Sequence, residues 1–177
     1  MSRIKKIDHV AIVVDDIEDA LEFWHDILGL DLSHVEDVPE EQSVVAFLPA
    51  NESEVELVRP TSDASGVARY LQKRGPGMHH ICFEVYDIED TLNHLKQRGV
   101  RLINDVPQIG TGGKKIAFIH PESTHGVLVE LYELHAQEPQ IRLSRARHLA
   151  DRVLTGGQNM ANAALEFLKR IRRENSK

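Results

Sequence analysis

Residues 78–85 read Met-His-His-Ile-Cys-Phe-Glu-Val, and this stretch decides the fold because it is the second copy of an earlier one. Residues 7–14, Ile-Asp-His-Val-Ala-Ile-Val-Val, match it in residue type when His80 is set on His9. The acidic stretches that follow, Asp-Ile-Glu-Asp-Ala-Leu and Asp-Ile-Glu-Asp-Thr-Leu, match at the same offset of 71 residues. A repeat longer than one supersecondary unit indicates two copies of one module.

Each copy also ends on a strand that carries a glutamate. The first closes with Glu-Val-Glu-Leu-Val around Glu56, and the second closes with Leu-Val-Glu-Leu-Tyr around Glu130. Each module therefore has one histidine on its first strand, His9 or His80, and one glutamate on its last. A buried carboxylate pair is costly without a cation, and two imidazoles with two carboxylates suit a divalent ion such as Co, Ni, Mn, Fe or Zn. The repeat thus predicts a metal site with positions left open for a substrate.

Four other reactive side chains have more ordinary interpretations. Strand alternation places His79 on the opposite face from His80, so we expect it to support His80 or to be structural. Cys82 lies on a strand and is expected to be a small buried residue rather than a nucleophile. His25 and His34 lie outside the strand pattern and are interpreted as surface residues.

The composition is that of one compact unit or of two small modules sharing a core, with 177 residues of which 41% are hydrophobic. No apolar run approaches the ~20 residues of a membrane-spanning helix. Residues 1–6 lack an apolar signal core and a long Arg- and Ser-rich transit stretch, so we expect a cytoplasmic protein. The single cysteine excludes an internal disulfide and fits a reducing compartment.

Charge is unevenly distributed along the chain. Residues 136–177 contain nine Lys and Arg against four Asp and Glu, whereas residues 1–135 contain twelve against twenty-four. An acidic body argues against nucleic acid as the main ligand. The basic tail has the apolar spacing of two amphipathic helices, split by Thr-Gly-Gly at 155–157. We expect it to pack on the body or on a second subunit, with docking to an acidic partner as the alternative.

The remaining pattern predicts alternating strands and helices. One helix begins at a cap at Asp15 or Asp16 and ends at Gly29, and another begins at Asp87 and ends at Gly99. Residues 61–77 form a connector between the modules, with a short helical patch at 67–71, and the acidic residues 35–42 are expected to be a loop. Strands are expected at 7–14, 43–48, 54–58, 78–85, 100–103, 115–120 and 127–132.

A glycine-rich stretch, Gly-Thr-Gly-Gly-Lys-Lys at 110–115, has two interpretations that the residue types leave equal. Its backbone N–H groups could cradle a phosphate, with Lys114 and Lys115 as counter-charges. It could also be a plain hairpin connection.

Five separate motifs resemble the methylmalonyl-CoA epimerase family of the vicinal oxygen chelate (glyoxalase/bleomycin-resistance) superfamily. The resemblance covers roughly residues 4–134. The motifs are DHVAI at 8–12, VEL at 55–57, GMHHI at 77–81, GTGGKKIAFIHP at 110–121 and GVLVEL at 126–131.

The resemblance implies an α+β fold of two paired βαβββ modules, residues 4–60 and 78–134, whose curved sheet wraps a divalent metal. Residues 136–177 would be a helical C-terminal extension without a counterpart in the family. Cobalt is the metal first implied, with nickel, manganese, zinc or magnesium as alternatives, and a homodimer is implied as well. The implied metal ligands are His9, Glu56, His80 and Glu130.

The activity implied is epimerisation at C2 of methylmalonyl-CoA through a metal-stabilised enolate. As a hypothesis, Glu130 would be one proton-transfer group, by loosening from the metal, and Glu41 on the acidic loop or a water would be the other. Some epimerases carry a catalytic glutamate on the strand matching 43–48, and that position falls near Ala46 here. The basic tail could dock to the mutase that consumes the product. The candidates for binding the CoA phosphates are Lys114, Lys115, Lys73 and Arg74.

Two other functions stay open at this point. Some family members have Gln where this chain has Glu56, and the all-His/Glu set also resembles nickel-type glyoxalase I, which isomerises a glutathione hemithioacetal. The superfamily further includes non-catalytic proteins that sequester small molecules. Those often lack the metal ligands, so the intact set favours an enzyme.

Overall fold

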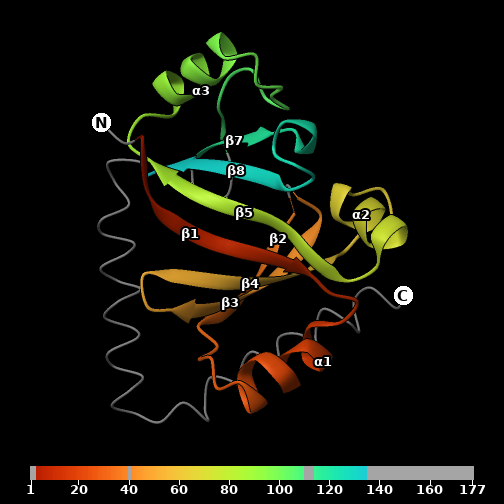
Figure 1. Ribbon diagram of the computed structural model, residues 1–177. Helices are drawn as coiled ribbons and strands as arrows, with labels where there is room; N and C mark the ends of the chain where they lie inside the picture. Colours follow the sequence, from red (N-terminus) through yellow and green to blue (C-terminus); the bar gives the residue numbers. More distant parts are fainter. Residues whose placement is uncertain (1–2, 40, 110–113, 135–177) are drawn as a thin grey trace.

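The computed structural model describes residues 3–39, 41–109 and 114–134 (Figure 1). Module one comprises β1 (Ile4–Val13), α1 (Ile17–Leu21), the π-helical turn η1 (Glu22–Ile27), β2 (His34–Val38), β3 (Ser43–Ala50) and β4 (Ser53–Pro60). Helix α2 (Gly66–Arg74) connects it to module two. Module two comprises β5 (Gly77–Val85), α3 (Ile88–Gln97), β6 (Gln108–Ile109), β7 (Lys115–Ile119), the 3₁₀ turn η3 (Pro121–Ser123) and β8 (Leu128–Glu133).

The strands form one curved eight-stranded sheet in the order β2-β3-β4-β1-β5-β8-β7-β6 (Figure 1). Its centre is the antiparallel pair β1–β5, the first strand of each module. Each of these strands is flanked on its other side by the last strand of its own module, in parallel: β4 beside β1 and β8 beside β5. The predicted pair of βαβββ modules is confirmed, and the topology brings the histidine and glutamate strands of both modules side by side.

An aspartate side chain caps the first helix of each module. The Asp16 side chain accepts hydrogen bonds from the N–H groups of Glu18 and Asp19, as predicted for the first helix. The Asp87 side chain caps α3 in the same way through the N–H of Asp90. In both modules the acidic first turn is also favoured by the helix dipole.

Helices α1 and α3 cover one face of the sheet, whereas α2 packs against part of the other face, which carries the site. On β3, Val44, Ala46 and Leu48 pack under α1, whereas Val45 and Phe47 face the opposite side. In module two, α3 packs on the corresponding face in the same manner. The buried residues of that cluster are Val85, Ile88, Leu92, Ala117, Ile119 and Leu131.

Two element predictions are wrong. Part of the expected loop 35–42 is strand β2, which pairs with β3 over His34–Val38 and carries its acidic residues at an edge of the sheet, where charges are tolerated. The strand expected at 100–103 is reduced to an isolated bridge between Leu102 and Ile119, and pairing with β7 occurs instead at Gln108–Ile109. The short patch 67–71 is part of a longer helix, α2, because Ser65 supplies an N-cap.

Other expectations lie outside the described residues, namely the helical extension 136–177 and the glycines at 110–113. Within the described part of the chain, no helix is long and apolar enough to cross a membrane.

Candidate metal centre

The central strands carry matching irregularities next to the two candidate histidines. In the β1–β5 ladder, Ile7 faces Phe83 and His9 faces Cys82, so Asp8 is an extra residue on β1. Likewise Ala11 faces His80 and Ile12 faces Met78, which makes His79 an extra residue on β5. Each register shift is a β-bulge, which re-aims side chains at that point. The repeat in the sequence is thus also a repeat of the bulge, one residue before each histidine.

Three potential ligand atoms converge where the modules meet. The Nε2 atoms of His9 and His80 are 3.0 Å apart, and Oε2 of Glu130 is 2.9 Å from Nε2 of His80 and 3.4 Å from Nε2 of His9. All three residues are buried. Ligands about 2.1 Å from a common ion, at tetrahedral to octahedral angles, are separated by about 3.0–3.4 Å. The donor set and its spacing are therefore consistent with a divalent metal.

Glu56 is the fourth predicted ligand, and it lies on the other side of the His9 ring. Its Oε1 is 3.6 Å from Nδ1 of His9. The other ring nitrogen of His9, Nε2, is the one that faces His80. Burial raises the pKa of Glu56, against the opposing charges of His9 and His80. Its coordination of the ion stays a prediction.

The histidines and carboxylates of the site shift one another's pKa values. Burial lowers the pKa of His9, but the charge of Glu56 and hydrogen bonds with Asp8, Cys82 and Glu130 outweigh it and raise that pKa well above its usual range. Burial would raise the pKa of Glu130, yet hydrogen bonds and charge from His80 and His9 bring it well below its usual range. At neutral pH the site holds an ionised Glu130 against a cationic histidine. A metal ion would take the place of that proton.

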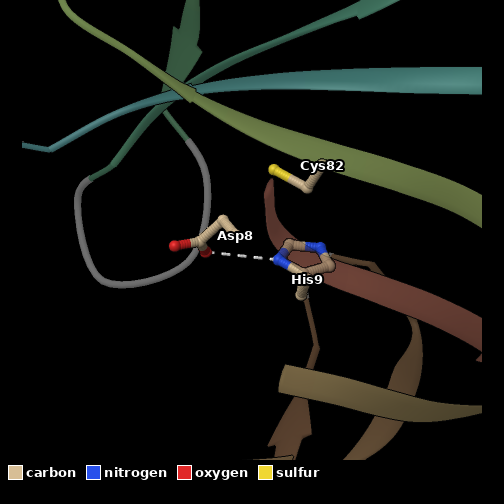
Figure 2. A group of neighbouring side chains, drawn as sticks. All are labelled: Asp8, His9 and Cys82. Atoms are coloured by element: carbon tan, nitrogen blue, oxygen red, sulfur yellow. Dashed lines mark hydrogen bonds and ion pairs between the residues drawn. The ribbon is translucent and has the colours of Figure 1, made fainter. Parts of the chain in front are cut away.

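Each bulged residue touches the outer nitrogen of its histidine. Oδ2 of Asp8 is 3.4 Å from Nδ1 of His9, and Nδ1 of His79 is 2.9 Å from Nδ1 of His80. Figure 2 shows the Asp8 carboxylate turned toward the His9 ring. The prediction that His79 points to the opposite face is wrong, because the bulge interrupts the alternation and His79 lines the same cavity as His80. Its expected supporting role beside His80 agrees with this contact.

Asp8 and Cys82 have different chemistry despite both lying beside His9 (Figure 2). Burial raises the pKa of Asp8, but the hydrogen bond and charge of His9, helped by Lys6, lower it to about 2. Burial raises the pKa of the Cys82 thiol to about 12, with the nearby Glu130 charge adding to the effect. Asp8 is therefore ionised and Cys82 is a neutral buried thiol, as its sequence position predicted.

Replacing the carboxylate beside His9 should weaken metal binding. A carboxylate that accepts the outer N–H of a histidine fixes its tautomer and orientation, and its loss costs about 10- to 100-fold in metal affinity. We expect Asp8→Asn to show this loss in calorimetric titration with Co(II). The control is Asp90→Asn, whose carboxylate pairs with Arg3 on the surface. Equal affinities of Asp8→Asn and the wild type would show that the Asp8 contact does not support the site.

The site opens into a cavity of about 190 Å³ on the face of the sheet opposite α1 and α3. His9, Glu56, His80 and Glu130 all line it. Its apolar walls come from both modules. These apolar lining residues are Val38, Val45, Phe47, Val58, Val67, Ile116, Phe118 and Tyr132. A small polar ligand would meet the metal site at the meeting point of the modules, shielded from water on several sides.

The remaining predicted residues are dispersed. Glu41 lines the cavity, and so does Lys114. Lys115 points away from it and pairs with Glu89 on α3, at 2.6 Å. Lys73 and Arg74 are in the last turn of α2, where Arg74 lies over the ring of Tyr70.

The strand that carries a catalytic glutamate in some epimerases provides no acid to this cavity. Ala46 is fully buried in the core under α1. The β3 side chains that line the cavity are Val45 and Phe47, both apolar. Of the acidic residues in the described β2–β3 region, Glu36 and Glu41 reach it.

Sequence reasoning missed Asp8 and Glu36 as site residues. Asp8 could have been found from its repeat partner His79, since both precede a candidate ligand at the same offset. Glu36 had no comparable signal, because the acidic stretch around it was interpreted as a loop. Its Oε2 is 3.6 Å from Nε2 of His34, which itself stacks on Phe47.

Comparisons with known proteins agree with this architecture. Residues 8–118 match the family model of the glyoxalase/bleomycin resistance protein/dioxygenase superfamily. The mitochondrial methylmalonyl-CoA epimerase of Mus musculus is 38% identical over 130 residues, which cover 73% of this chain and 73% of that protein. The ethylmalonyl-CoA/methylmalonyl-CoA epimerase of Cereibacter sphaeroides is 36% identical over 133 residues, covering 74% and 99%.

A solved structure shows the same fold. The Streptomyces coelicolor methylmalonyl-CoA epimerase in complex with 2-nitronate-propionyl-CoA superposes with a TM-score of 0.70 at 34% identity, covering 75% of this chain and 96% of that one. The paired modules, the buried His9, His80 and Glu130, and these matches lead to one assignment. The chain belongs to the glyoxalase/bleomycin resistance protein/dioxygenase superfamily, also called the vicinal oxygen chelate superfamily, and its named relatives include methylmalonyl-CoA epimerases.

Proposed function

We propose that this protein is a metal-dependent epimerase that interconverts the two configurations at C2 of methylmalonyl-CoA. The observation that carries the proposal is the convergence of His9, His80 and Glu130 at a partly open cavity, in a chain similar to named epimerases. His9, Glu56, His80 and Glu130 would hold a divalent ion, cobalt being our first choice. When bound, the ion would stabilise the negative charge that develops on the thioester oxygen as the C2 proton leaves.

The chain's own carboxylates would move the protons. Glu130 is ionised, since its pKa lies well below the usual range, and it would accept the C2 proton by loosening from the ion. Glu41 lines the same cavity from the β2–β3 turn of module one and would return a proton to the other face of the enolate. One proton is removed at C2 and one is added there, so the configuration inverts without any net change in composition. Groups of this kind each contribute about 10²–10⁴-fold in rate.

The CoA portion would lie outside the cavity. Lys73 and Arg74, at the end of α2, are our candidates for its phosphates, because α2 also contributes Val67 to the cavity wall. We further propose a homodimer. For residues 136–177 we propose packing on the body or on the second subunit. Docking of this basic tail to the mutase that consumes the product is the alternative.

The test is exchange of the C2 hydrogen. The cobalt-loaded protein is incubated in D₂O with methylmalonyl-CoA of one configuration, and C2–H is followed by NMR with a chiral readout. Exchange with inversion supports the epimerase. Turnover of the methylglyoxal–glutathione hemithioacetal without C2 exchange would instead place the protein with glyoxalase I. If metal binds but neither substrate reacts, the proposal is wrong.

A further inference from the structure

The cavity is too small for a whole acyl-CoA. Its volume is about 190 Å³, whereas sites that enclose a drug-sized ligand have about 300–1,000 Å³. Only the acyl end of a CoA thioester can enter, and the nucleotide must stay outside. The charged side chains that line the cavity therefore meet the acyl group and not the phosphates.

Acidic side chains outnumber lysines and arginines in the cavity. Among the described residues that line it, Lys114 is the only lysine or arginine. Apart from the metal site, a free carboxylate on the acyl group would therefore find its cationic partner in Lys114. The acidic residues that line the cavity are Asp8, Glu36, Glu41, Glu56 and Glu130.

Strand alternation directs Lys114 inward and Lys115 outward. Lys114, Ile116 and Phe118 line the cavity, whereas Lys115 pairs with Glu89, and Ala117 and Ile119 pack under α3. The alternation of side chains along β7 thus continues to Lys114, the residue just before the strand, and places it on the cavity side. Two adjacent lysines with the same sequence context thus have different surroundings.

The Lys114 ammonium lies over Tyr132, a residue of the strand that carries Glu130. Its Nζ is 4.7 Å from the centre of the Tyr132 ring. Tyr132 is buried on β8, two residues after Glu130 and therefore on the same face of that strand.

We propose that Lys114 is a specificity residue that binds the free carboxylate of the acyl group. It would make the cavity select dicarboxylic acyl thioesters over acyl thioesters that end in a neutral group. This inference rests on the proposed function, because it names the part of the substrate that the same site distinguishes. It also moves Lys114 from the CoA phosphates, where the sequence placed it, to the acyl group.

The experiment compares Lys114→Met, Lys114→Arg and Lys96→Met as cobalt-loaded full-length proteins. For C2 exchange of methylmalonyl-CoA, Lys114→Met should raise KM by about 10- to 100-fold and change kcat much less, as expected when a hydrogen bond to a charged group is lost. Lys114→Arg should restore most of the affinity, because it keeps the charge. Lys96→Met, at an exposed position of α3, is the control and should stay within about twofold of the wild type.

Binding of small probes separates this inference from the proposed function. Malonate and its monoamide, malonamate, are titrated calorimetrically into each protein. Lys114→Met should lose about 10-fold or more in affinity for malonate relative to malonamate. Equal losses for both probes, or no loss, would overturn the role of Lys114. If the wild type fails to exchange methylmalonyl-CoA, the proposed function is overturned, and the malonate titration alone decides the role of Lys114.

Discussion

His80→Ala should lose C2 exchange by at least about 10³-fold, together with stoichiometric metal binding. His80 supplies the Nε2 atom that lies 3.0 Å from His9 and 2.9 Å from Glu130, so its removal leaves two of the three converging atoms. Losing a single donor aimed at a developing oxyanion already costs about 10²–10³-fold. Losing the ion should cost more, because the ion provides several kcal/mol of charge stabilisation. The measurement is C2 exchange in D₂O, with metal content determined on the same sample.

The control for this variant is His94→Ala. His94 lies on α3, outside the residues that line the cavity, and alanine is a good helix former. We expect His94→Ala to keep wild-type exchange and metal content. Metal-free His80→Ala should melt cooperatively, which shows that the fold survives. Retention of more than a tenth of the exchange rate by folded His80→Ala would remove His80 from the metal site.

Removing the metal should lower the stability of the protein by several kcal/mol. A ligand that binds only the folded state stabilises it by about 4 kcal/mol when present at 1,000 times its Kd. For a protein of this size, each kcal/mol corresponds to about 2–4 °C in Tm, so the expected shift between chelated and metal-loaded protein is about 8–16 °C. The measurement is a pair of thermal melts, one in EDTA and one in excess Co(II). His80→Ala should show almost no shift.

Metal binding should become stronger as the pH rises. The pKa of His9 is raised well above its usual range, so His9 is protonated at neutral pH and must release that proton to bind the ion. Apparent metal affinity should therefore increase as pH rises toward the pKa of His9 in the folded state. Calorimetry in two buffers of different ionisation enthalpy should detect release of about one proton per ion. A metal-independent Tm, or affinity that falls with rising pH, would contradict this description of the site.

The strands that carry His9 and His80 show which site residues the sequence pattern could predict and which it could not. The 71-residue repeat identified His9, His80, Glu56 and Glu130 as one set, because each module has its histidine on its first strand and its glutamate on its last. His9, His80 and Glu130 do converge. The pattern failed at His79, since simple alternation assumes an uninterrupted strand and a bulge is produced by the pairing of two strands.

The proton-transfer groups were harder to predict. Glu41 was proposed from its acidic loop and does line the cavity, but Glu36 was missed because its strand lies at the edge of the sheet and carries charges. The inward direction of Lys114 and outward direction of Lys115 follow from the face that β7 presents to α3. That contact joins segments that are distant in the chain, and the paired residues Lys115 and Glu89 are 26 positions apart. Residue type alone treats both lysines alike.

The sequence by itself determined the doubled module, its helix caps and the histidine and glutamate positions. These depend on local periodicity and on residue types that are visible along the chain. Only the tertiary structure decided which atoms converge, where the cavity closes and which lysine enters it. Those features depend on the register between β1 and β5, whose paired residues His9 and Cys82 are far apart in the chain, and on the bulges that this pairing creates. The free energy of such long-range pairing is set by contacts across the whole sheet, which no local stretch of residues contains.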